Sequence, residues 1–313
     1  MKKIIALLIS AVMLTACSNT AVNNTQTEEG FPVTVNNYDR EVTVNRKPQK
    51  VLTLGPNCTE LFVALGLQDY IVGTSLKNHS RGPLPEYKEI YKTLPELNYG
   101  SATREATISS GADFIYGIDW EFGESALDIA ELESYGMSVY KNSATTLDEQ
   151  SNEILDIGKI FKIEETAQKY VDEQKSRIKA VGDAVKDLDK PNVLVYDSGN
   201  DGVFTCSGVN FESLLIEKAG GKNIFSDLTE KQWVTVSYEE VIKRNPDVIV
   251  IHDYDSPSVE EKIAEIKANK VLAQLDCVKN DRFVIIDLES VLPGNRMAYS
   301  VEKLSKGFFP NKF

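Results

Sequence analysis

Two segments of the chain repeat one pattern of apolar and polar positions. Residues 103–116 align without a gap with residues 237–250, and each copy starts with a hydroxyl residue and ends in an apolar run. Each copy predicts a short amphipathic helix, a break and a buried strand. A unit that occurs twice, far apart in the chain, predicts two similar α/β lobes. The matching pairs include Glu105 with Glu239, Ile108 with Ile242, Asp113 with Asp247, and Ile115 with Ile249.

Two helix starts show a polar residue followed three positions later by Glu. Ser237 and Glu240 form this pattern in the second repeat unit, and Asn57 and Glu60 form it at a helix predicted over 58–65. Such a pair predicts a capping box, in which two otherwise unpaired backbone N–H groups are bonded reciprocally. Glu60 is therefore interpreted as a capping residue.

Short apolar runs alternate with helical patterns along most of the chain. Residues 31–44 alternate in a way that predicts a hairpin, whereas 198–208 is interpreted as a glycine-bearing loop. The order strand, helix, strand predicts a mainly parallel sheet with helices on both faces. The other runs interpreted as strands are 51–54, 71–73, 138–140, 193–196 and 283–286.

The middle of the chain has a different, helical pattern. Apolar residues at spacings of three and four predict one amphipathic helix up to Phe161 and a longer one over 164–188. We therefore predict an α/β fold of two Rossmann-like lobes, each a mainly parallel sheet flanked by helices, joined by one long α-helix, with the ligand cleft between the lobes. The predicted parts are an N-terminal lobe 31–163, a linking helix 164–189 and a C-terminal lobe 190–313.

The amino terminus has the pattern of a bacterial lipoprotein signal. Two lysines precede an apolar run over 4–14, and Leu14-Thr-Ala-Cys17 follows. This predicts a signal peptide over 1–17 with lipidation at Cys17, and the polar segment 18–30 is interpreted as a flexible tether. The product is expected at the extracytoplasmic face of the cell membrane, held there by its lipid anchor.

Charge and cysteines narrow the function further. The formal net charge of −13 becomes −15 without Lys2 and Lys3, which argues against nucleic acid or an anionic lipid surface as partner. The remaining cysteines are odd in number and have no zinc-site spacing. They are interpreted as small buried residues, with one disulfide pair left open. They are Cys58, Cys206 and Cys277.

Taken in order, these motifs resemble the helical-hinge (class III) substrate-binding lipoproteins of ABC importers for iron–siderophore complexes, haem and cobalamin. The resemblance extends over residues 31–310. Its carriers are the lipobox, the run 51–66, the repeat units ending in Gly111-Ala-Asp113 and Asn245-Pro-Asp247, the run 219–225, and Pro293-Gly-Asn-Arg296.

The resemblance implies a function and site residues. The protein would be a monomeric binding protein, not an enzyme, without an intrinsic cofactor, and would deliver a small metal chelate to an ABC permease and its ATPase. Glu105 and Glu239 would dock onto arginines of the permease. Residues carried over by position to the ligand cleft are Tyr99, Trp120, Phe204, Trp233 and Arg296.

The two histidines are further candidates. His252 ends a predicted strand and His79 lies in a loop, both on the cleft side. Imidazole can bind haem iron, and some members of the family use a histidine to fill a vacant position on chelated iron. Both residues are therefore candidate ligands of chelated iron.

The charges predicted around the cleft favour a neutral or cationic ligand, because multiply anionic complexes would need a basic cleft. We therefore expect a ferric siderophore of that charge, with haem or cobalamin as the alternative. A chelatase-like enzyme is the alternative of another class, although the chain has no Gly-x-Ser-x-Gly, His-Glu-x-x-His or Gly-x-Gly-x-x-Gly motif. The acidic residues are Asp119, Glu121, Glu124, Asp197, Asp201, Asp253 and Asp255, and the basic ones Lys77, Arg81 and Arg296.

Overall fold

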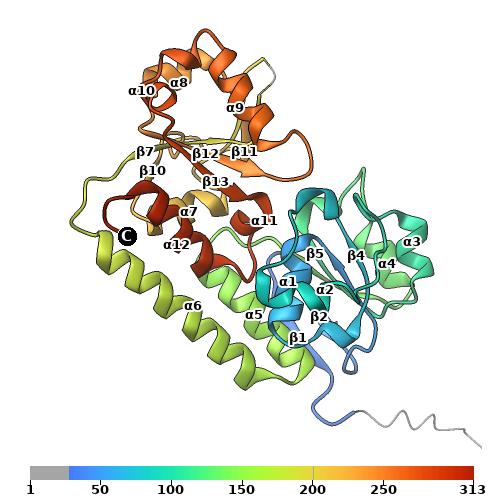
Figure 1. Ribbon diagram of the computed structural model, residues 1–313. Helices are drawn as coiled ribbons and strands as arrows, with labels where there is room; N and C mark the ends of the chain where they lie inside the picture. Colours follow the sequence, from blue (N-terminus) through green and yellow to red (C-terminus); the bar gives the residue numbers. More distant parts are fainter. Residues whose placement is uncertain (1–27, 200) are drawn as a thin grey trace, which may run out of the picture.

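Two parallel β-sheets, one in each half of the chain, organise the computed structural model, which describes residues 28–199 and 201–313 (Figure 1). The predicted signal peptide, its Cys17 and most of the predicted tether lie outside these residues. The first sheet has the order β4-β3-β5-β6 and the second the order β10-β7-β12-β13. The α/β fold with parallel sheets flanked by helices is therefore confirmed.

The two central strands of the first sheet are buried on both faces, as parallel strands covered by helices usually are. Its strands are β3 (Val51–Leu54), β4 (Ile71–Ser75), β5 (Phe114–Ile118) and β6 (Ser138–Asn142). The helices of this lobe are α1 (Pro56–Ala64), α2 (Lys88–Tyr91), α3 (Arg104–Ser109) and α4 (Ile129–Ser134). The predicted hairpin is confirmed as β1 (Val33–Asn37) paired with β2 (Arg40–Val44).

The second sheet repeats this arrangement. Its strands are β7 (Asn192–Tyr196), β10 (Lys222–Asn223), β12 (Val248–Asp253) and β13 (Phe283–Asp287). The helices of this half are α7 (Phe211–Lys218), α8 (Tyr238–Arg244), α9 (Val259–Ala268), α10 (Asp276–Lys279), α11 (Leu288–Val291) and α12 (Met297–Phe308).

The two repeat units fold alike down to their side-chain contacts. Thr103 caps α3 and Ser237 caps α8, each through its side-chain oxygen. After the helix, Asp113 accepts hydrogen bonds from the backbone N–H groups that lead into β3, and Asp247 accepts one from Asn192 N at the start of β7. The repeat seen in the sequence is therefore a structural repeat.

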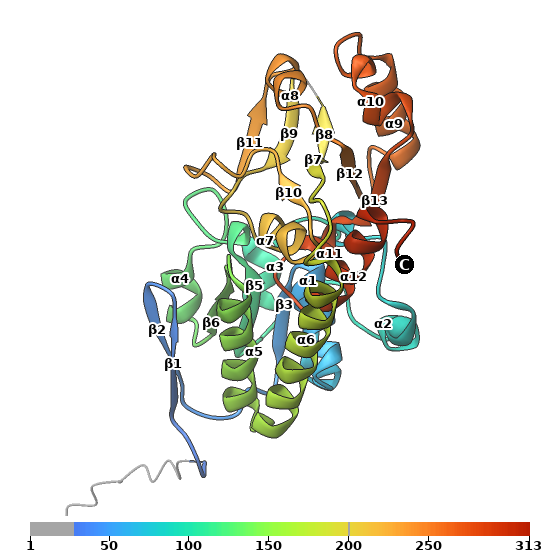
Figure 2. The same ribbon diagram turned by 90° about the vertical axis from the view of Figure 1, so that its left-hand side faces the viewer.

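A pair of long helices connects the two halves. α5 (Leu147–Phe161) packs along α6 (Glu164–Val185), and α6 also packs against α12 near the end of the chain (Figures 1 and 2). One buried apolar cluster runs through both lobes and includes Phe62, Val193 and Val301. The lobes are thus joined on this side by a continuous core as well as by a helix.

Two local predictions are wrong. Helix α1 begins at Pro56 with Gly55 as its cap and no side-chain cap bond, so Asn57 and Glu60 form no capping box. In α8, Ser237 does accept from Glu240 N, but the Glu240 carboxylate pairs with Arg244 instead of returning to the cap.

The segment interpreted as a loop over 198–208 contains two strands. β8 (Ser198–Gly199) and β9 (Val203–Cys206) join β11 (Trp233–Val236) in a three-stranded antiparallel sheet of order β11-β9-β8. This small sheet lies beside the second parallel sheet (Figure 2). It changes the setting of Phe204 and Trp233 from loops to paired strands.

Candidate functional site

A narrow pocket lies between the lobes, at the carboxyl ends of the parallel strands where open α/β sheets generally bind ligands. It has a volume of about 20 Å³, close to the space that one water molecule needs. Its lining comes from both halves of the chain and includes Asp119, Trp120 and Ser143 from the first, and Phe211, Gln232 and Trp233 from the second.

The C-terminal wall of this cleft is aromatic. Phe204 on β9 stacks on Trp233 on β11, with ring centroids 5.6 Å apart, because the antiparallel pairing places the two strands side by side. Phe204 is 37% exposed, and Trp233 is half-buried. Together they present a broad apolar face with one indole N–H as a polar group.

Aromatic rings from both lobes meet on the other side of the cleft. His79 lies 6.3 Å from Trp120, of the same lobe, and stacks at 6.4 Å on Tyr254, of the opposite lobe. Its Nδ1 is 3.0 Å from Asn78 Oδ1. Burial lowers the pKa of His79, so the ring is neutral at pH 7 and its Nε2 has a lone pair when Nδ1 carries the proton.

Polar residues from both lobes close the outer edge of the cleft. Tyr99 Oη donates to Asp255 Oδ2 at 2.7 Å, and Arg81 Nε donates to Asp253 Oδ1 at 2.7 Å. The backbone of Asp255 also donates to Asn78 O at 3.4 Å. We call these five residues the mouth contact. Tyr99, predicted as a ligand residue, thus contacts the opposite lobe.

His252 is placed differently from what the sequence suggests. It is fully buried at the end of β12, with Nδ1 2.9 Å from Asp197 Oδ1 and Nε2 3.0 Å from both carboxylate oxygens of Glu212. Both ring nitrogens are therefore engaged by protein carboxylates. This geometry contradicts a role as an iron ligand.

Arg296 also lies apart from the pocket. Only 2% of its side chain is exposed, and it forms ion pairs with Glu60 of helix α1 and with Glu289. Its Nε donates to Glu60 Oε1 at 2.6 Å. The guanidinium thus joins the two lobes. Its main partner is Glu60, which was interpreted from the sequence as a capping residue.

Further hydrogen bonds surround this ion pair. Asn295 Nδ2 donates to Glu60 Oε1 at 2.8 Å, and Asn57 Nδ2 donates to Pro293 O at 2.7 Å. We call Asn57, Glu60, Pro293, Asn295 and Arg296 the hinge contact. The side-chain hydrogen bonds that join these five residues across the lobes are buried, and Arg296 Nη2 also donates to Gly82 O at 2.9 Å.

Most of the acidic residues expected around the cleft are engaged by protein donors. Asp119 accepts from Ser143 Oγ at 2.8 Å, and Glu121 accepts from Ala102 N and Ser75 Oγ. Asp197, Asp253 and Asp255 have the partners described above, while Glu124 and Asp201 are exposed. The oxygens of these carboxylates are consequently less available to bind a ligand than the sequence implies.

The structure offers no ready-made metal site among residues 28–199 and 201–313, where no cluster of three or more His, Cys, Asp or Glu could hold an ion. Cys58, Cys206 and Cys277 are free and buried, so the disulfide left open does not form. The part of the chain with described coordinates also has no helix both long and apolar enough to cross a membrane.

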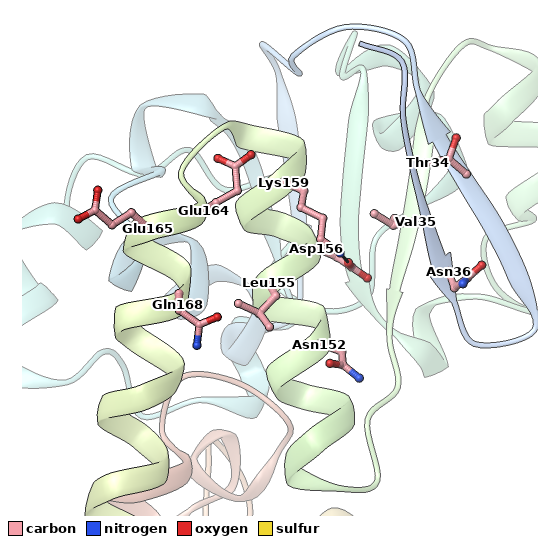
Figure 3. A pocket seen from close by; sticks show the side chains of 10 residues that line it. All are labelled: Thr34, Val35, Asn36, Asn152, Leu155, Asp156, Lys159, Glu164, Glu165 and Gln168. Carbon is pink, nitrogen blue, oxygen red and sulfur yellow. Dashed lines mark hydrogen bonds and ion pairs between the residues drawn. The ribbon is translucent and has the colours of Figure 1, made fainter. Parts of the chain in front are cut away.

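A larger hollow lies elsewhere on the surface. It has a volume of about 700 Å³ and runs between the hairpin strand β1 and helices α5 and α6 (Figure 3). Its lining contains no aromatic residue, and its one ion pair joins Lys159 to Asp156 at 2.8 Å. A large flat ligand would find no stacking partner there.

Comparison with known proteins identifies the family. Residues 51–289 match the Periplasmic binding protein family. The chain belongs to this family. It is 28% identical to the uncharacterized ABC transporter substrate-binding lipoprotein YvrC of Bacillus subtilis, over 98% of this chain and 96% of that protein. It is 27% identical to the vitamin B12-binding protein of Vibrio campbellii, over 66% of this chain and 71% of that protein.

Solved structures agree with this membership. A periplasmic binding protein from Veillonella parvula superposes with a TM-score of 0.80 at 25% identity, covering 90% of this chain and 98% of that one. The resemblance to substrate-binding proteins of ABC importers is therefore confirmed at the level of the family.

The two residues of this periplasmic binding protein that were predicted to dock onto the permease, Glu105 and Glu239, are both exposed. Each occupies the first turn of its helix, α3 or α8. Sequence reasoning missed Tyr254 and the pairing of Glu60 with Arg296. The available signal for the missed strands was a spacing of two, which places Val203 and Thr205 on one face of the first strand and Val234 and Val236 on one face of the second.

Proposed function

We propose that this protein is the lipid-anchored, extracytoplasmic binding component of an ABC importer and that it captures an iron chelate of the neutral ferric siderophore type. One observation carries the proposal: Trp120 of the first lobe and Trp233 of the second line the same pocket. Aromatic walls suit a large chelate with apolar surface. The neighbouring carboxylates are engaged by protein donors and Arg296 is buried, which favours a ligand without strong charge.

A second candidate is a corrinoid. The Vibrio campbellii relative is a vitamin B12-binding protein, and a corrinoid also offers a broad face for stacking on Trp233. The absorption spectrum of protein purified from its host separates the candidates, because ferric hydroxamates, haem and corrinoids absorb differently in the visible range. A spectrum with no visible band after purification under all growth conditions, together with no binding in titrations, would contradict both.

The ligand assignment can be tested with one side chain. We expect Trp233→Ala to weaken binding of a ferric hydroxamate by about tenfold or more, as truncation of a central aromatic commonly does. Tyr135→Ala is the matched control, since Tyr135 is 55% exposed and stands just before β6, at the edge of the sheet opposite the cleft. Equal affinities of the two variants would remove Trp233 from the site.

We further propose that Glu105 and Glu239 dock onto the permease. Their support is the structural repeat, which places both carboxylates in the first turn of equivalent helices, where the helix dipole also favours acidic residues. Reversing both charges, Glu105→Lys with Glu239→Lys, should abolish uptake in cells and leave chelate affinity unchanged.

The matched control reverses two other first-turn glutamates. Glu165 of α6 and Glu260 of α9 are also exposed and hold the same position relative to a helix dipole. Glu165→Lys with Glu260→Lys should retain uptake. Loss of uptake in both pairs would point to a general charge effect and would overturn the docking assignment.

A further inference from the structure

A buried cluster of charges lies directly behind the aromatic wall of the C-terminal lobe. At its centre is His252, between Asp197, which follows β7, and Glu212, in the first turn of α7. His252 and Glu212 are fully buried, and Asp197 is 8% exposed. A carboxylate accepts and cannot donate, so a ring with a carboxylate on each nitrogen must donate from both and is an imidazolium.

The energetics agree with a protonated ring. Burial lowers the pKa of His252, but the charge of Glu212 and the hydrogen bonds that the ring donates to Asp197 and Glu212 outweigh it and raise the pKa to about 9. Asp197 responds in the opposite sense: burial raises its pKa, but the bond to His252 outweighs this and lowers it. The pair is thus ionised at neutral pH, because the pKa of His252 lies above 7, whereas that of an ordinary histidine is about 6.5.

Lys262 and Cys206 also face the cluster, and Lys262 lies in turn near Asp253 and Arg81. Lys262 of α9 donates from Nζ to His252 O at 2.7 Å. Burial lowers the pKa of Lys262 to about 8. Cys206 on β9 lies near Glu212, and burial raises the pKa of its thiol, which stays neutral. No other described residue is bonded to either nitrogen of His252.

Two aromatic residues of the cleft rest on this cluster. Trp233 stands edge to face against the His252 ring, with centroids 5.8 Å apart and planes at 77°. Tyr254 Oη donates to Asp197 Oδ2 at 3.0 Å, and Lys262 Nζ lies 3.7 Å from the Tyr254 ring centroid. The same buried cluster therefore contacts both Trp233, on which Phe204 stacks, and Tyr254, on which His79 stacks.

We propose that His252 is a positioning residue of the ligand site: the imidazolium, held by Asp197 and Glu212, fixes Trp233 and Tyr254 in the C-terminal wall of the cleft. The effect of His252 on ligand binding rests on the proposed function, since the chelate would stack on this wall. It assigns to His252 a role behind the aromatic surface, without contact to iron.

The sign of the pH dependence follows from the raised pKa. Protonation of His252 stabilises the folded arrangement fully below about pH 6.5, the usual histidine pKa. The stabilisation falls as the pH rises above that value and is lost as the pH passes through about 9. The wall should accordingly loosen on the alkaline side, as the pH passes through about 9, and stay intact at neutral pH.

The chain has two tryptophans and two histidines, so two substitutions are enough to isolate the signals of Trp233 and His252. In the variant Trp120→Phe with His79→Gln, Trp233 is the only tryptophan and His252 the only histidine. Without any ligand, we expect NMR to show both ring nitrogens protonated at pH 7. Imidazolium quenches indole fluorescence, so Trp233 emission should rise with a midpoint near the same pH of about 9 at which the ring titrates.

Two further substitutions complete this test. Adding His252→Gln should abolish the fluorescence transition, with folding checked by circular dichroism. Adding Glu212→Gln removes one charge and should lower the midpoint, which keeps the idea testable if the first variant does not fold. A Trp233 transition unchanged in every folded variant, or a His252 ring that is neutral at pH 7, would overturn the proposal.

A ligand arm separates this proposal from the proposed function. In the otherwise unchanged protein, His252→Gln should weaken binding of a ferric hydroxamate by about tenfold, toward the loss expected for Trp233→Ala. Binding that is sensitive to Trp233→Ala but not to His252→Gln would overturn the positioning role alone. Absence of binding with the expected fluorescence transitions would overturn the proposed ligand alone.

Discussion

The lobes meet at two places that differ in their surroundings. In the hinge contact, Glu60 and Arg296 have side chains that are 0% and 2% exposed. In the mouth contact, Arg81 and Asp253 are 42% and 22% exposed. Removing one member of a buried pair leaves an unpaired buried charge, whereas an exposed pair exchanges its partner for water at little cost.

This difference shows which side of the cleft can open. The hinge contact is adjacent to the apolar cluster that runs through both lobes, and Tyr170 of α6 donates to Asn295 O at 2.9 Å. Beside the mouth contact the lobes also meet through the stacked rings of His79 and Tyr254. A pocket of about 20 Å³ is far below the roughly 300–1,000 Å³ of common ligand sites, so the proposed chelate would require the cleft to open, and the exposed mouth contact would be the side to separate.

The largest effect should come from breaking the buried pair. Glu60→Ala removes the acceptor of Arg296 Nε and Nη2, Asn295 Nδ2 and Leu84 N, while Glu289 stays paired with Arg296. The loss of these buried bonds, two of them charge-assisted, is expected to reduce the free energy of unfolding by about 3–5 kcal/mol. Urea unfolding at equilibrium measures this change. Glu86→Ala, at an exposed glutamate of the same lobe, should stay within about 0.5 kcal/mol of the parent. A Glu60 variant as stable as the Glu86 variant would show that the hinge contact does not hold the lobes.

An intermediate effect should follow from removing a neutral hydrogen bond in the same place. Asn57→Ala leaves Pro293 O and Asn142 Oδ1 without the donor that each has at 2.7 and 2.8 Å. The expected loss is about 1–3 kcal/mol, the cost of leaving buried acceptors unsatisfied. Asn152→Ala, on the outer side of α5 (Figure 3), is the control for loss of an asparagine. A loss for Asn57 no greater than for Asn152 would argue that water replaces the bond.

The smallest effect on stability is expected at the mouth. A double-mutant cycle with Arg81→Ala and Asp253→Ala should give a coupling energy of about 0.2–1 kcal/mol that declines with added salt. If the mouth opens to admit ligand, the same variants should change the rate of chelate release more than the unfolding free energy, which stopped-flow fluorescence can follow. A coupling energy as large as that of the hinge pair would contradict the comparison.

A good part of the fold was predictable because it depends on local patterns. The repeat units, the hairpin and α6 all show periodicities in which apolar residues recur at the spacing of a helix or strand. The small sheet of β8, β9 and β11 was missed because glycines at 199, 202 and 208 suggested a loop, and because its strands pair with a segment nearly thirty positions away.

The site was predictable only in part. Trp120 and Trp233, carried over from the family resemblance, line the pocket between the lobes, and Phe204 stacks on Trp233. Glu60 and Arg296 were misread because their partnership spans 236 positions, and a Glu three residues after a polar residue is locally indistinguishable from a cap. His252 was misread because its two carboxylate partners come from a different strand and a helix.

The sequence by itself determined the lobed α/β architecture and the twin placement of Glu105 and Glu239, because both follow from short-range pattern and its repetition, and its motifs carried the resemblance to the family that the comparisons confirm. Only the tertiary structure decided which charged residues are available to a ligand. Whether a carboxylate or an imidazole is free depends on partners that folding brings together from distant positions, and burial multiplies the cost of leaving any of them unpaired. That is why His252 and Arg296 lie behind the cleft, while the aromatic rings face it.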